Sequence, residues 1–87
     1  MNDQTEWFIN RVKQAVASKY PISPDDVFVV WYAKVLKNSK ALVSFRTNDD
    51  YLQGVYIEAT YNGHDDELYL DTYGKVEHKV IKTDFNN

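Results

Sequence analysis

Acidic and histidine side chains gather in one short run of this sequence, Asn62-Gly63-His64-Asp65-Asp66-Glu67. An imidazole and several carboxylates this close together can hold a divalent cation. The run lacks the alternating oxygen ligands of a calcium-binding loop, and Asn-Gly is the strongest short signal for a β-hairpin turn. We therefore expect a solvated turn here and no metal site.

Three side chains have the chemistry for acid–base catalysis, Glu58, Asp71 and His64. If Glu58 and Asp71 lie on adjacent strands, they can face each other as the carboxylate pair of a hydrolase does. The outward positions of an antiparallel sheet are polar in any case. The chain has no cysteine and no serine in a G-x-S-x-G signature. We expect no enzymatic activity and no catalytic residue.

The three glycines, Gly54, Gly63 and Gly74, stand alone in the sequence. A phosphate-binding loop needs several glycines at fixed spacing, as in G-x-x-x-x-G-K or G-x-G-x-x-G, so that the backbone can approach the phosphates. Neither pattern occurs, which excludes the usual nucleotide-binding enzymes. We expect no cofactor.

Tyrosines and acids alternate with apolar residues along two segments that resemble β-strands. Six of them occupy alternate positions within their segment, so that those of one segment point to the same face: Tyr56, Glu58, Glu67, Tyr69, Asp71 and Tyr73. An exposed strip of this kind resembles a protein-binding surface, because tyrosine is enriched among the residues that carry binding energy. The same rings could instead pack across strands or under a helix, since parity does not say which face is covered.

The formal charge of −3 argues against a protein that binds nucleic acid by broad phosphate neutralisation. Two local groups of basic residues, with aromatic residues nearby for stacking, keep that class as an alternative. They are Lys34, Lys37, Lys40 and Arg46, and Lys75, Lys79 and Lys82. Acidic clusters at 25–26, 49–50 and 65–67 could together imitate a phosphate track, although turns normally contain acids.

The elements that must position these residues begin with one amphipathic helix over about residues 4–19. Five apolar side chains fall on one helical stripe: Phe8, Ile9, Val12, Ala15 and Val16. Pro21 disfavours helical geometry at the residue before it, so the helix ends there. Ser23-Pro24 followed by two acids is typical of a helix start. Because the next residues are β-branched and aromatic, we expect only a short turn.

Five strands are expected, over about residues 27–36, 41–46, 51–61, 67–72 and 76–82. The first is apolar on both faces and should be central in the sheet. The fifth carries Lys79 and Lys82, which suit an edge strand. The predicted core is Phe8, Val12, Val16, Val29, Trp31, Val43, Val55, Ile57, Leu68 and Leu70.

The 87 residues have room for one domain, spanning residues 1–87. The predicted fold class is α+β, with the N-terminal amphipathic helix packed on a four- or five-stranded antiparallel β-meander. No apolar run approaches the roughly 20 residues that span a bilayer, and the absence of cysteine suits a reducing compartment. We expect a cytoplasmic protein without membrane contact. A homodimer through an edge strand or a sheet face is compatible with this fold.

Several segments resemble a family of small uncharacterised proteins from phages and prophages of Gram-positive bacteria, classed as a domain of unknown function. They are Val29-Val30-Trp31, the run from Lys34 to Ser44, Glu58-Ala59-Thr60-Tyr61-Asn62-Gly63, and the run from Glu67 to Tyr73. The resemblance implies a phage accessory protein in the host cytoplasm, and it supplies no catalytic residues. The leading hypothesis is a non-enzymatic protein that binds and modulates or inhibits a host protein, with a defence nuclease as one concrete target.

Overall fold

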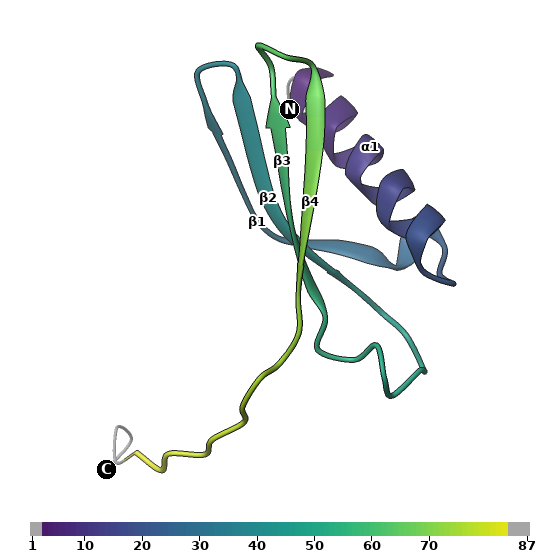
Figure 1. Ribbon diagram of the computed structural model, residues 1–87, viewed down its shortest axis with the longest axis vertical. Coiled ribbons are helices and arrows are strands. Elements are labelled where there is room, and N and C mark those ends of the chain that lie inside the picture. Colours follow the sequence, from purple (N-terminus) through teal and green to yellow (C-terminus); the bar gives the residue numbers. More distant parts are fainter. Residues whose placement is uncertain (1–2, 84–87) are drawn as a thin grey trace.

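The computed structural model describes residues 3–83, which form one long helix, one short 3-10 turn and four strands (Figure 1). The helical elements are α1 (Asp3–Lys19) and η1 (Pro24–Asp26). The strands are β1 (Val27–Val35), β2 (Asn38–Phe45), β3 (Tyr56–Asn62) and β4 (Glu67–Tyr73). Each strand pairs antiparallel with the next, in the order β1-β2-β3-β4. The α+β meander expected from the sequence is confirmed.

Helix α1 lies along one face of the sheet (Figure 1). Its apolar side chains belong to the same core cluster as those of the strands. Phe8, Val12 and Val16 recur every four residues and are buried, as the 3.6-residue helical period requires. The backbone amide of Tyr20 donates to the Val16 carbonyl at 3.0 Å, and the helix gives way to a turn before Pro21. The predicted helix over residues 4–19 is confirmed.

The short turn expected before the first strand forms at η1. The Ser23 hydroxyl accepts a hydrogen bond from the Asp25 amide, and the Asp26 carboxylate accepts one from the Ser23 amide, both at 3.2 Å. This reciprocal pair is a capping box, which satisfies two amides that a helix start leaves free. The Val27 side chain then enters the core and β1 begins.

The core lies between α1 and the face of the sheet that it covers. Five predicted core residues are buried there: Phe8, Val12, Val16, Val43 and Ile57. Three more pack against this core while partly exposed: Val55, Leu68 and Leu70. Four buried apolar residues were not predicted: Val27, Ala41, Phe45 and Ala59. For Val29 and Trp31 the prediction is wrong, because both are exposed.

A β-bulge in β1 explains the error at Trp31. Val29 lies opposite Val43, but Trp31 lies opposite Leu42, so β1 contains one extra residue, Val30, at this point. An extra residue shifts the alternation, and the side chains after it change faces. Val29 therefore shares the face of the buried Val43, whereas Trp31 lies on the opposite face.

Two expected strand boundaries and one position in the sheet are also corrected. β1 is an edge strand and not central. β2 begins at Asn38, because the turn before it needs only two residues, Leu36 and Lys37. The strand predicted over 51–61 begins at Tyr56. Gly54 has φ = 81°, which is incompatible with a strand, and it ends the turn that starts at Asp49.

The fifth strand predicted over residues 76–82 does not form. Residues 74–83 continue away from the sheet as an extended segment, with no strand partner in the described part of the chain (Figure 1). No helix within residues 3–83 is long and apolar enough to cross a membrane.

Candidate functional site

The sheet has one face that α1 does not cover, here called the uncovered sheet face. Five aromatic side chains lie on it, with exposed fractions between 39% and 53%: Phe28, Trp31, Tyr56, Tyr69 and Tyr73. Their positions follow from the pairing, because residues directly opposite each other on adjacent strands point to the same face. Contiguous exposed apolar patches are typical of interaction sites, which makes this face the candidate site.

The strand register shows how this face is built. One row runs across all four strands, from Trp31 to Leu42, then Glu58, then Asp71. On one side of this row Tyr56 lies opposite Tyr73. These four cross-strand pairings place exposed rings beside the acidic pair Glu58 and Asp71.

Acidic groups outnumber basic ones on this face. Lys40 Nζ lies 3.4 Å from Glu58 Oε1. The Tyr69 hydroxyl donates to Glu67 Oε1 at 2.9 Å and accepts a hydrogen bond from the side-chain Nδ2 of Asn62 at 3.5 Å. Asp71 lies opposite Glu58. Of the three carboxylates, only Glu58 has a salt-bridge partner within residues 3–83.

A cation lies at the rim of the uncovered sheet face. The guanidinium carbon of Arg46 lies 5.9 Å from the centre of the Phe28 ring. This distance is in the range of a cation–π contact, which keeps the ring and the charge together at the surface. The uncovered sheet face therefore combines exposed rings, carboxylates and one rim cation.

All six residues predicted as a binding strip lie on the uncovered sheet face: Tyr56, Glu58, Glu67, Tyr69, Asp71 and Tyr73. Glu58 is half-buried and the other five are exposed. Their role in binding stays a prediction. Sequence reasoning missed Phe28 and placed Trp31 in the core, because the unbroken apolar run in β1 hides the bulge that turns Trp31 outward.

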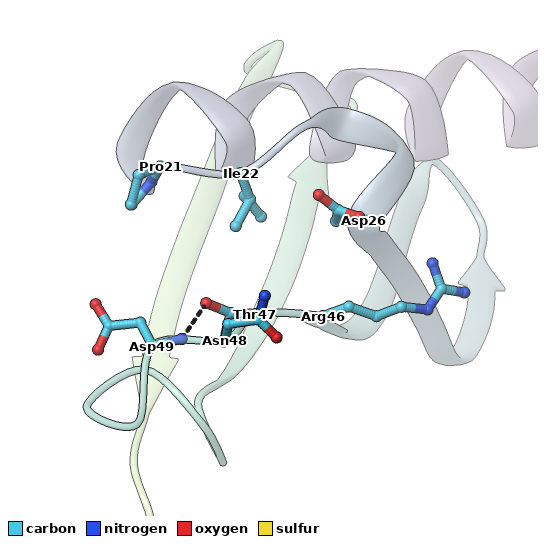
Figure 2. A pocket seen from close by; sticks show the side chains of 7 residues that line it. All are labelled: Pro21, Ile22, Asp26, Arg46, Thr47, Asn48 and Asp49. Carbon is cyan, nitrogen blue, oxygen red and sulfur yellow. Dashed lines mark hydrogen bonds between the residues drawn. The ribbon is translucent and has the colours of Figure 1, made fainter.

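A polar hollow of about 420 Å³ lies at the end of the sheet next to η1 (Figure 2). Pro21, Ile22 and Asp26 form one side, and the segment 46–49 forms the other. The Arg46 amide donates to the Asp26 carbonyl at 2.9 Å, and the Asp49 amide donates to the Thr47 hydroxyl at 3.1 Å. These hydrogen bonds hold the 46–49 segment against η1, so a structural role accounts for the polar groups around the hollow.

A second hollow, of about 310 Å³, lies between α1 and the β3–β4 end of the sheet. Trp7 and Tyr61 meet edge to face with ring centres 5.1 Å apart. The Tyr61 hydroxyl donates to Asp66 Oδ1 at 2.7 Å. This hydrogen bond, together with desolvation and the charge of Asp66, raises the pKa of Tyr61. The tyrosine is therefore held in its neutral, hydrogen-bonded form.

The 62–67 run forms the turn between β3 and β4. Asn62 Oδ1 accepts bonds from the amides of His64 and Asp65, and His64 Nδ1 lies 2.9 Å from Asp65 Oδ1. Within residues 3–83, no three histidine or acidic side chains are grouped closely enough to hold a metal ion. The acidic clusters also do not form one track, because Asp26 and Asp49 line the hollow at the opposite end of the sheet.

The fold and this face define a small α+β domain with exposed aromatic side chains on an open sheet. The sequence matches, over residues 2–83, the model of a family described as a family of unknown function, DUF6275. The chain belongs to this family. Neither the curated proteins nor the solved structures contain a match.

Proposed function

We propose that this chain is a non-enzymatic binding protein that uses the uncovered sheet face to modulate or inhibit a host protein. The observation that carries the proposal is the group of five exposed aromatic side chains on the sheet face that α1 leaves open. Rings of this kind supply contact area at a low cost in side-chain entropy. Glu67 and Asp71 beside them favour a partner surface that is basic and apolar.

The origin and location are part of the same proposal. A phage-encoded accessory protein in the cytoplasm of a Gram-positive host accords with the resemblance described above and with a chain that contains no cysteine. Such proteins act by occupying a host protein, and inhibition of a defence nuclease is one concrete form. No residue is assigned a catalytic role.

A single-stranded nucleic acid is the alternative partner, because bases can stack on exposed rings of an antiparallel sheet. Arg46 beside Phe28 favours it. Three observations oppose it. The first is that the carboxylates of Glu58, Glu67 and Asp71 would face the negatively charged phosphates; the other two concern lysines whose charge is already engaged. Lys40 is engaged with Glu58, and Lys34 donates to Gln4 on the α1 side of the sheet. We therefore rank a protein partner first.

The test is an affinity capture from host lysate with the tagged chain, with and without nuclease, analysed by mass spectrometry. The proposal expects one host protein that is retained after nuclease treatment. It also expects Tyr56→Ala with Tyr69→Ala to lose that protein. Tyr51→Ala is the matched control, since Tyr51 is 95% exposed but lies in the 46–55 loop.

Two results would contradict the proposal. Capture that disappears with nuclease would favour the nucleic-acid alternative. Capture that is unchanged in the Tyr56→Ala, Tyr69→Ala variant, with circular dichroism showing that the variant is folded, would mean that another surface binds the partner.

A further inference from the structure

The segment after β4 exposes apolar side chains that a monomer leaves in water. Val76 is fully exposed, and Val80 and Ile81 are each exposed by more than two thirds. The segment is extended and runs away from the sheet (Figure 1). β-Branched residues in an extended chain are suited to strand pairing, so this segment has the composition of a strand without a neighbour.

The free edge of β4 is a surface to which such an extended segment can pair. β4 is the last strand of the sheet, and its pairing with β3 is regular over all seven residues. The other edge strand, β1, is interrupted by its bulge. A regular edge presents unpaired amides and carbonyls to another chain, whereas a bulge opposes such pairing. The β4 edge is therefore the better template.

The conformation at Gly74 argues against pairing within one chain. A two-residue hairpin turn at 74–75 would need a positive φ at Gly74. Within residues 3–83, Gly54 is the only glycine with positive φ. The chain therefore continues straight from β4 through Gly74, and its extended segment points away from its own β4 edge.

We propose that residues 67–83 of two copies of this chain pair antiparallel about a two-fold axis at Lys75. A two-fold axis between antiparallel strands places one residue opposite itself. With Lys75 on the axis, Asp71 lies opposite Lys79 of the second copy, Leu70 opposite Val80, and Tyr69 opposite Ile81. Opposite charges and aromatic–β-branched pairs are the cross-strand neighbours that stabilise a sheet.

The register with the axis at Gly74 is less favourable than the one with the axis at Lys75. With the axis at Gly74, Asp71 would lie opposite Glu77 of the second copy, and like charges directly opposite are destabilising. The axis at Lys75 places two ammonium groups in proximity, but the Lys75 side chain lies against Gly54 of its own chain. A Cβ built on Gly54 would be 3.6 Å from Lys75 Cε.

Single cysteines test this register directly, because the chain has none of its own. Lys75→Cys places the two thiols opposite each other, at a Cα separation of about 4.5–5.5 Å that a disulfide can bridge. Lys82→Cys is the control on the same segment; its two copies would be about 45 Å apart along the strands. We expect mild oxidation to cross-link the Lys75→Cys chain and not the Lys82→Cys chain, and light scattering to give a dimer for the natural chain.

Charge exchange gives a second readout. Asp71→Lys and Lys79→Asp should each weaken the dimer by about tenfold, and the double variant should restore it. These experiments need only the purified chain, so their failure leaves the proposed host-binding function untouched.

Three results would overturn the proposal. The first is a monomeric mass at all concentrations. The second is equal cross-linking of the two cysteine variants. The third is a monomer whose amides in residues 76–82 are protected from hydrogen exchange, because the segment would then pair within its own chain.

Discussion

Gly63, in the β3–β4 turn, packs directly against the backbone of Lys37 in the β1–β2 turn. A Cβ atom built on Gly63 would overlap the Lys37 carbonyl oxygen and lie 2.9 Å from the Lys37 Cβ. The Gly63 amide also donates to Asn38 Oδ1 at 3.3 Å. Two turns that are distant in the sequence are therefore joined at one end of the sheet, and only a residue without a side chain fits there.

Gly63→Ala should lower the free energy of unfolding by roughly 1–3 kcal/mol, because backbone must shift to accept the methyl group. Urea denaturation measures this change. Gly74→Ala is the control, since a Cβ there meets nothing within 4 Å, and its effect should stay within about 0.5 kcal/mol. Equal effects of the two substitutions would show that the turns do not meet in solution.

Ser39→Ala should stabilise the fold by about 1 kcal/mol. Ser39 is buried, and its hydroxyl has no hydrogen-bond partner within residues 3–83. Removing an unsatisfied buried hydroxyl removes its desolvation cost. Ser44→Ala is the matched comparison on the same strand and should destabilise by roughly 0.5–1.5 kcal/mol, because the Ser44 hydroxyl donates to the Val55 carbonyl at 2.7 Å. Thermal unfolding of both variants decides whether the signs differ.

Phe8→Ala should cost roughly 3–5 kcal/mol, since Phe8 is 1% exposed at the centre of the core. Trp31→Ala should cost clearly less, because the bulge turns Trp31 onto the uncovered sheet face. The same denaturation experiment compares the two. If Trp31→Ala were as damaging as Phe8→Ala, the placement of the bulge would be wrong.

The alkaline titration of Tyr61 should depend on Asp66. The hydrogen bond to Asp66, with desolvation and the carboxylate charge, raises the pKa of Tyr61 above the ordinary value of 10.0. Asp66→Asn should lower that pKa toward the ordinary value. The measurement is the near-ultraviolet difference titration between each protein and its Tyr61→Phe counterpart, which isolates this ring from the six other tyrosines.

The same shift fixes the sign of a stability effect. A group whose pKa is raised by folding contributes stability that is present below its unfolded pKa and lost as the pH rises through its folded pKa. The difference in the free energy of unfolding between the natural chain and Tyr61→Phe should therefore be constant at neutral pH. It should disappear above about pH 10. An advantage that grew with alkaline pH would contradict the assigned hydrogen bond.

Local sequence signals were sufficient for the elements that depend on neighbours along the chain. The spacing of Phe8, Val12 and Val16 determined the helix and its buried stripe. Ser23 and Asp26 encode a capping box that needs only four residues. The alternation in β3 and β4 placed the tyrosines and acids of the predicted strip on one face. These features repeat with the period of a single helix or strand.

Only the tertiary structure decided which face is open and where the strands meet. The bulge near Val29 depends on how β1 pairs with β2, and it moves Trp31 from the predicted core to the surface. The apolar run of β1 predicted a central strand, but β1 lies at the edge of the sheet. Its apolar side chains on the uncovered sheet face stay exposed, because a single helix cannot cover both faces. Residues 76–82 likewise have no partner strand within the described residues. The local sequence could not show this, because strand pairing depends on contacts with distant parts of the chain.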